Sequence, residues 1–189
     1  MTSYGWVTLA LWIVWYAYWA VSARGRAKMS RADSGASFLA YRVTNVTAIL
    51  LLLVPRFRDT WINTQIFEPT AGIMIVGVLL TIAGLGISVW ARVYLGAQWT
   101  GRVGVREGHQ LIRSGPYRFV RHPIYSGMLL AFIGTALVYC DWRSLVAIVM
   151  MAVALAYKLQ REERWMREHF AADYQAYHRQ VAAIIPGVL

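Results

Sequence analysis

The chain has 189 residues, of which 58% are hydrophobic and only 15% are charged. Because a soluble domain carries about 25% charged and 45–50% apolar residues, this composition excludes an ordinary soluble protein and indicates an all-α integral membrane protein. The formal net charge of +10 would suit a protein that binds nucleic acid, but the distribution of the basic residues follows membrane topology. The single cysteine, Cys140, excludes an internal disulfide. We expect no nucleic-acid partner and no metal, since nothing has CxxC or HExxH spacing.

The first apolar run, Tyr4–Ser22, contains no charge and is long enough to span a bilayer. Basic residues follow it, whereas in a signal peptide they would precede it, so we expect an uncleaved helix whose N-terminus lies outside. Trp12, Trp15 and Trp19 share one face of this helix, as expected for packing residues or for an aromatic belt at the lipid interface.

Two further spans are predicted in the first half of the chain. Phe38–Val54 is the second, and Ala71–Trp90, which is uncharged and rich in small residues, is the third. Small residues four positions apart let two helices approach closely, which is a packing feature. The pairs with this spacing are Gly77 with Thr81 and Gly84 with Ser88.

The last two apolar runs are Ile124–Tyr139 and Ser144–Tyr157, joined by four residues. At 1.5 Å per residue each is only about 21–24 Å long, so we expect a tight helical hairpin in a thin or partly wet part of the membrane. From Lys158 the chain turns polar, and an amphipathic helix is predicted to continue out of the last span and to end before Pro186. The prediction is thus about five transmembrane helices followed by a C-terminal amphipathic helix.

Charge predicts the orientation of these spans. With the N-terminus outside, the segments 23–37 and 91–123 and the tail from residue 158 fall on one side, and they hold 4, 6 and 5 basic residues, which is 15 of the 19. The positive-inside rule therefore predicts that these segments face the cytoplasm. The membrane would be the inner membrane of a bacterium, or that of the endoplasmic reticulum if the source is eukaryotic. Two polar elements far apart in the sequence are then free to meet.

The first of these elements is His109–Tyr125, in which side chains able to hold a ligand are dense. It contains two histidines, three arginines and two tyrosines, and Pro116 and Pro123 bias its backbone toward turns. Arg118 and Arg121 also suit a simpler role, as topogenic charges or as contacts to lipid headgroups.

The second element offers two adjacent acids, Glu162 and Glu163, where the last span leaves the membrane. A carboxylate near the bilayer boundary is costly unless it has a partner, so a ligand-facing role is plausible. A solvated, salt-bridged helix is the alternative that spacing alone leaves open.

The run SGPYRFVRHPIYSG is followed by the predicted hairpin, the EE pair, an F-x-x-x-Y-x-x-Y pattern and a terminal I-P. This order resembles the isoprenylcysteine carboxyl methyltransferase family, whose wider group includes membrane phospholipid N-methyltransferases. The resemblance covers roughly Val93–Pro186, and RHPxY with a downstream EE pair is its most specific part. The matching residues are Gly115-Pro116-Tyr117, Arg121-His122-Pro123-x-Tyr125, Glu162-Glu163, Phe170, Tyr174, Tyr177 and Ile185-Pro186.

The resemblance implies an integral membrane enzyme that moves a methyl group from S-adenosylmethionine to a lipophilic or lipidated substrate entering from the bilayer. Length and composition predict one membrane domain, 1–189, with two N-terminal helices in 4–54, and the resemblance implies a cofactor-binding methyltransferase core in 71–189. Lys158 falls where the family has a basic substrate-contacting residue. The cofactor-binding residues that it implies are His109, Gln110, Leu111, Ile112, Tyr117, His122, Pro123, Ile124, Tyr125 and Glu162.

The accepting group is left open by the residues. An isoprenylcysteine-type carboxylate is ionised at pH 7 and needs only a cation to orient it, for which Lys158 or Arg161 would serve. An amine, as in a phospholipid, would have to lose a proton, which makes Glu163, His122 or a water-linked tyrosine a candidate base. Two other functions remain as alternatives, a nicotinamide-dependent reductase related to sterol reductases and a non-catalytic membrane protein that binds a ligand.

Overall fold

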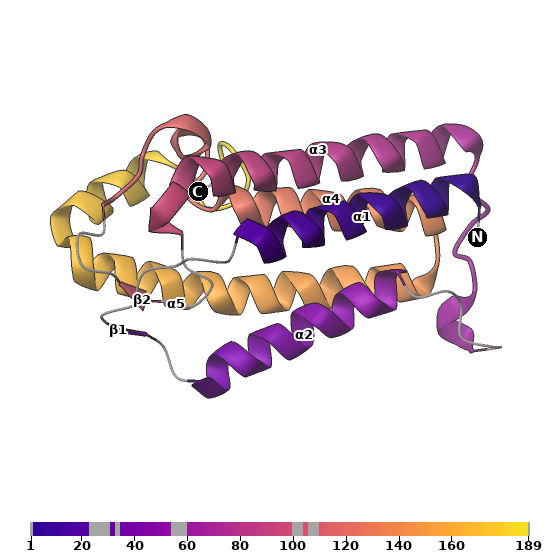
Figure 1. Cartoon of the computed structure of the whole chain (residues 1–189), viewed down its shortest axis with the longest axis horizontal. Coiled ribbons are helices and arrows are strands. Elements are labelled where there is room, and N and C mark those ends of the chain that lie inside the picture. The colour runs from indigo at the N-terminus through magenta and orange to yellow at the C-terminus, as the bar shows by residue number, and fades with distance from the viewer. Residues whose placement is uncertain are drawn as a thin grey trace.

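A computed structural model of the protein describes residues 2–22, 31–32, 35–53, 60–99, 104–105 and 110–188, and long helices dominate it (Figure 1). The α-helices are α1 (Ser3–Ser22), α2 (Gly35–Leu53), α3 (Ala71–Leu95), α4 (Pro123–Tyr139) and α5 (Trp142–Gln180). Three short 3-10 helices, η1 (Trp61–Asn63), η2 (Gly96–Gln98) and η3 (Gly115–Arg118), and one antiparallel pair of two-residue strands, β1 (Arg31–Ala32) and β2 (Gly104–Val105), accompany them. The predicted all-helical class is confirmed for these residues, with the strand pair as an unpredicted addition.

Each of the five predicted apolar runs forms a helix. Three helices are long and apolar enough to cross a membrane, at Ser3–Ser22, Ala71–Gln98 and Trp142–Gln180, while the apolar parts of α2 and α4 are shorter. An integral membrane protein is therefore indicated, and the count of five spans stays a prediction. The third run extends past Trp90 to Leu95, because Gly96, with φ of 51°, is the first residue to leave the helix.

The polar tail is helical and continuous with the last apolar run, because α5 runs from Trp142 through Lys158 to Gln180. Ala171 interrupts it with non-helical angles, φ 41° and ψ −114°, and beyond this residue the helix changes direction at one end of the bundle (Figure 1). The chain after Lys158 is thus helical as far as Gln180, whereas an amphipathic helix at a membrane surface stays a prediction.

Helices α3 and α4 pack closely through their glycines. A Cβ atom placed on Gly77 would lie 2.6 Å from the carbonyl oxygen of Gly134, and one on Gly84 would lie 2.4 Å from that of Gly127. The relation is reciprocal, since a Cβ on Gly127 would lie 2.4 Å from the oxygen of Gly84. The expected role of the small residues of the third run in helix packing is therefore confirmed.

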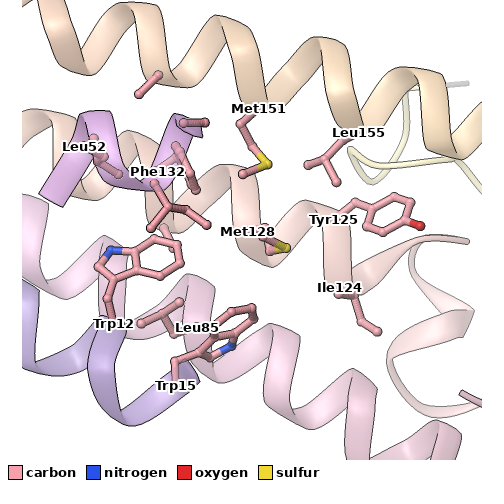
Figure 2. Close-up of a cluster of buried hydrophobic side chains, with 14 of the residues drawn as sticks. Trp12, Trp15, Leu52, Leu85, Ile124, Tyr125, Met128, Phe132, Met151 and Leu155 are labelled. Carbon is pink, nitrogen blue, oxygen red and sulfur yellow. The ribbon is translucent and has the colours of Figure 1, made fainter. Parts of the chain in front are cut away.

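Tryptophans of α1 fasten it to this pair of helices. Trp12 donates from Nε1 to Thr135 Oγ1 at 3.0 Å, and Trp15 donates from Nε1 to Ser88 Oγ at 2.7 Å. Both indoles are almost fully buried in the cluster of apolar side chains shown in Figure 2. Of the two roles expected for these residues, Trp12 and Trp15 have the packing role.

The predicted hairpin of the last two runs is present as α4 and α5. Cys140 ends α4 in the left-handed region at φ 50°, and Asp141 begins α5 by accepting a hydrogen bond from Ser144 N at 2.9 Å. Arg143 Nη2 lies 3.1 Å from Asp141 Oδ2, so two buried charges compensate each other at the turn. This turn and η3 lie at opposite ends of the bundle (Figure 1), so the hairpin presents the start of α4 and the polar part of α5 at the same end.

Candidate active site

The segment before α4 is fixed on the end of α3. Gly115 has φ of 60°, and a Cβ there would lie 2.5 Å from the ring of Tyr94, so only glycine lets the chain pass this ring. Tyr94 Oη donates to Ser114 Oγ at 2.9 Å, and Tyr117 Oη donates to the carbonyl of Ala91 at 3.4 Å. The predicted turn-rich character of this segment is confirmed from residue 110 onward.

The C-terminal segment lies along the residues that precede α4. Backbone N–H groups of Arg121 and His122 donate to the carbonyls of Ala182 and Ala183 at 2.8 and 2.9 Å. Tyr177 Oη also donates to the carbonyl of Tyr117 at 2.5 Å. The two polar elements, separated by an apolar hairpin in the sequence, therefore meet at one end of the bundle.

Glu163 is the anionic centre of this contact. Arg121 donates to its Oε1 from Nε at 2.9 Å and from Nη2 at 2.7 Å, and both side chains are 6% exposed. Arg167 donates to Oε2 at 3.0 Å, and His178 Nε2 lies 3.4 Å from the same oxygen. Arg121 also donates from Nη1 to the carbonyl of His178 at 3.0 Å. This network ties α5, its bent end and the segment before α4 together.

The role of Arg121 differs from the simpler one suggested by the sequence. We expected a topogenic charge or a lipid-headgroup contact, but its guanidinium is buried and reaches Glu163 through two nitrogens. The reason is charge pairing, because two guanidinium nitrogens donate to one oxygen of the Glu163 carboxylate and so compensate the cost of burying both charges. Its place directly before the His-Pro pair of the motif is the only sequence signal for this role.

Glu162 has different surroundings. Its side chain is 24% exposed, and its Oε2 accepts a hydrogen bond from Tyr125 Oη at 2.6 Å. His122 Nδ1 lies 3.6 Å from the same oxygen, and Lys158 Nζ lies 3.6 Å from Oε1. In Figure 2 the hydroxyl of Tyr125 points away from the apolar cluster, so the ring closes the core while its polar end reaches this carboxylate. Glu162 is thus held by three side chains while part of it stays accessible.

His122 lies between the two acids. Its Nδ1 faces Glu162, its Nε2 lies 3.5 Å from Glu163 Oε1, and its ring stacks on Tyr125 with centroids 5.3 Å apart and planes 8° from parallel. Burial opposes protonation of this imidazole, yet contacts with the two carboxylates outweigh burial and raise the pKa of His122 above its ordinary value. The two acids therefore favour the protonated form of the imidazole that lies between them.

The other residues predicted for the site are spread around this centre. Pro123 and Ile124 are buried at the start of α4, whereas Gln110 is exposed and Leu111 and Ile112 are half-buried. Arg161 donates to Tyr157 Oη at 3.0 Å, one turn earlier on α5. His109 lies outside the described residues. The structure thus brings together Tyr117, His122, Tyr125, Lys158, Glu162 and Glu163 at one end of the bundle.

One neighbour of this group has no counterpart in the sequence prediction. Tyr41, on α2, places its ring 4.7 Å from Lys158 Nζ. No motif marks it, because α2 lies outside the matching half of the chain, and only the packing of α2 against α5 brings the residue to the site.

Comparison with known proteins gives the family. A model of the phospholipid methyltransferase family matches residues 73–173. A rice (Oryza sativa subsp. indica) probable protein-S-isoprenylcysteine O-methyltransferase is 30% identical over 138 residues, which are 71% of this chain and 67% of the rice protein. Protein-S-isoprenylcysteine O-methyltransferase B of Arabidopsis thaliana is 29% identical over 115 residues, 59% of this chain and 58% of the plant protein. The cobalt-zinc-cadmium resistance protein CzcN of Cupriavidus metallidurans is 28% identical over 152 residues, 76% of this chain and 60% of that protein.

The family match covers more than half of the chain, and it includes the start of α4 and the two glutamates of α5. The relatives from rice and Arabidopsis carry the name of the enzyme family that the motifs resemble. The chain therefore belongs to the phospholipid methyltransferase family, among its isoprenylcysteine carboxyl methyltransferase-like members, and is an integral membrane methyltransferase.

Proposed function

We propose that this enzyme transfers the methyl group of S-adenosylmethionine to the carboxylate of a lipophilic, isoprenylcysteine-type substrate that reaches the site from the bilayer. The names of the plant relatives support the substrate class. The observation that carries the proposal is the partly exposed carboxylate of Glu162, held by Tyr125, His122 and Lys158 where the two polar elements meet.

The residues present suit the chemistry of the proposed cofactor. S-adenosylmethionine supplies an electrophilic methyl group on a sulfonium, and it also carries an ammonium, a ribose diol and a carboxylate. Glu162 is an acceptor for hydroxyl or ammonium donors, and the stacked rings of His122 and Tyr125 offer aromatic contact nearby. We assign the cofactor to Glu162 with His122, Pro123, Ile124 and Tyr125, together with Tyr117 and the segment 109–112.

Glu162 and Glu163 then have different tasks. Glu163 is buried and already paired with Arg121, Arg167 and His178, so it holds the two polar elements together. Glu162 is more exposed and is the one that reaches a ligand. The positive partners of Glu163 stabilise its ionised carboxylate, so Glu163 is a weak base for removing a proton from a substrate.

The same electrostatics favour a carboxylate substrate over an amine. The two carboxylates beside His122 raise its pKa and so favour its protonated form, which makes it a poor candidate base. A carboxylate needs no base, and the ammonium of Lys158 supplies the cation that orients it. N-methylation of a phospholipid amine is the second candidate, which the description of the matching family supports.

Catalysis in this proposal rests on alignment and on the exclusion of water. Holding the acceptor in line with the methyl group supplies about 7–11 kcal/mol of the barrier through effective molarity. The tail residues 182–184, which pair with residues 121, 122 and 126, cover the site end and restrict water. By the distribution of basic residues we place this end of the bundle in the cytoplasm.

The cofactor assignment is tested with purified protein in detergent. Glu162→Gln and His122→Ala should each lose binding of S-adenosylmethionine in calorimetry, while Glu168→Gln, an exposed acid on the same helix, should bind as wild type does. Circular dichroism checks that the variants stay folded. Wild-type affinity in both Glu162→Gln and His122→Ala would refute the site.

The reaction is tested with methyl-labelled S-adenosylmethionine and two acceptors, N-acetyl-S-farnesylcysteine and phosphatidylethanolamine. We expect label in a base-labile ester of the first acceptor. Label only in the phospholipid would replace the proposed O-methylation by N-methylation, and label in neither acceptor would refute both candidates.

A further inference from the structure

The ammonium of Lys158 lies between two aromatic rings that come from different helices. The ring centroid of Tyr41, on α2, is 4.7 Å from Nζ, and that of Tyr125, on α4, is 5.4 Å away. Both distances are within the range in which a cation is attracted to the face of an aromatic ring. Three helices therefore converge on one charge, and α2 belongs to the N-terminal part of the chain, to which no motif assigns a role.

The position of Tyr41 is itself fixed by its neighbours. Asn45 lies one turn later on α2, and its amide donates to Tyr41 Oη at 3.5 Å and contacts Met151 Sδ at 3.6 Å. Because Met151 is fully buried on α5, its contact with Asn45 anchors this part of α2 against α5, and the backbone of α2 then places the ring of Tyr41.

Lys158 has capacity for a further anion. Its side chain is only 12% exposed, and its carboxylate partner within the described part of the chain, Glu162, is 3.6 Å away. A well-formed hydrogen bond from an amine nitrogen is about 2.7–3.2 Å long, and an ammonium has three donors. The two rings attract the cation but carry no negative charge, so they hold it in place without neutralising it and leave it able to bind a carboxylate.

We infer that Tyr41 is a positioning residue for the substrate. Its ring holds the ammonium of Lys158 against Tyr125, so that the ammonium binds the carboxylate of the lipophilic substrate, and α2 forms part of the substrate site. A lysine side chain is flexible and lacks the planar fork of arginine, and the two rings supply the rigidity that its stem lacks. This inference rests on the proposed function.

The first test follows the side chain of Lys158 without substrate. The chain has two lysines, Lys28 and Lys158, so labelling with 13Cε-lysine gives two resonances, which a Lys28→Arg variant assigns. Ring currents should shift the Lys158 resonance in wild type and in Tyr41→Phe, and Tyr41→Ala should move it toward the position of a free lysine. Trp61→Ala removes an exposed ring of η1, which lies next to the turn between α4 and α5, and should change nothing. An unchanged Lys158 resonance in Tyr41→Ala would overturn the inference.

The second test compares N-acetyl-S-farnesylcysteine with its uncharged carboxamide. Tyr41→Ala should weaken binding of the carboxylate by about 3- to 30-fold, the range expected for a cation–π contact, and should leave the carboxamide unaffected. Tyr41→Phe keeps the ring and should bind the carboxylate as wild type does. In a Lys158→Met background, Tyr41→Ala should have no further effect.

The outcomes separate this inference from the proposed function. An equal loss for carboxylate and carboxamide in Tyr41→Ala would show that Tyr41 contacts the lipid chain, which overturns the inference and leaves the proposed reaction intact. Wild-type protein could instead show the ring-current shift and yet neither bind nor methylate the carboxylate better than the carboxamide. That result would refute the proposed O-methylation, and with it the anion-binding role of Lys158.

Discussion

The glycine contacts between α3 and α4 predict a sharp difference between two substitutions on one helix. In Gly84→Ala the new Cβ would lie 2.4 Å from the carbonyl oxygen of Gly127 and 2.5 Å from the nitrogen of Ala131. Both neighbours are backbone atoms, which have no rotamer to change. The helices must therefore separate by about 1 Å to reach the 3.3–3.6 Å at which carbon and carbonyl oxygen pack.

That separation should lower the free energy of unfolding by about 1–3 kcal/mol, the usual cost of overpacking. Gly86→Ala is the matched control, because a Cβ there meets nothing within 4 Å. Any gain in helix propensity from replacing glycine by alanine is common to both variants and cancels in the comparison. The separation of the helices in Gly84→Ala should also weaken the hydrogen bond from Trp15 to Ser88, which lies one turn further along α3.

The assay is denaturant unfolding in mixed micelles, followed by circular dichroism, with methyl transfer measured on the same samples. Gly84→Ala should unfold at lower denaturant than Gly86→Ala and should lose activity, because α3 and α4 carry the contacts that fix Tyr117 and Tyr125. Equal midpoints for the two variants would refute the close packing described for these helices.

Three further outcomes are expected. Arg121→Ala removes the buried cation that pairs with the Glu163 carboxylate and should cost about 3–5 kcal/mol of stability, whereas Arg118→Ala at an exposed position should cost under 0.5 kcal/mol, both measured by denaturant unfolding. The pKa of His122 is raised in the folded state, so its contribution to the free energy of unfolding is fully present below about pH 6.5 and is lost as the pH rises through the folded pKa. Unfolding measured over a pH series should therefore show a fall in the stability of wild type over that range and a smaller fall in His122→Gln. Trp15→Phe removes the hydrogen bond to Ser88 and should cost about 1 kcal/mol in the same unfolding assay, and no loss would contradict that bond.

Much of the fold was predictable from local pattern. Apolar runs located the first four helices and the first part of α5 to within a few residues, because a bilayer requires long uninterrupted apolar helices whatever their partners are. Small residues four positions apart predicted close packing between helices, and Gly77 and Gly84 do provide it. The sequence pattern did not predict which helix would pack there, since a row of small residues can pack against any helix of complementary shape.

The site was predictable where a motif is contiguous. His122, Tyr125 and Glu162 were singled out, and they do lie together, although their roles in binding stay predictions. The assignment of tasks to the two adjacent acids was not available from the sequence. Only the structure distinguishes Glu163, buried beneath Arg121, from Glu162, which is partly exposed.

Hydrophobicity and charge act residue by residue, so local sequence sufficed to indicate membrane helices and to predict that the charged segments share one side. Which side chains share an environment became known from the folded chain. Arg121 became a buried partner of Glu163 and Tyr41 a neighbour of Lys158, over separations of 42 and 117 positions in the chain. Burial and charge pairing depend on such distant contacts, and no local pattern records them.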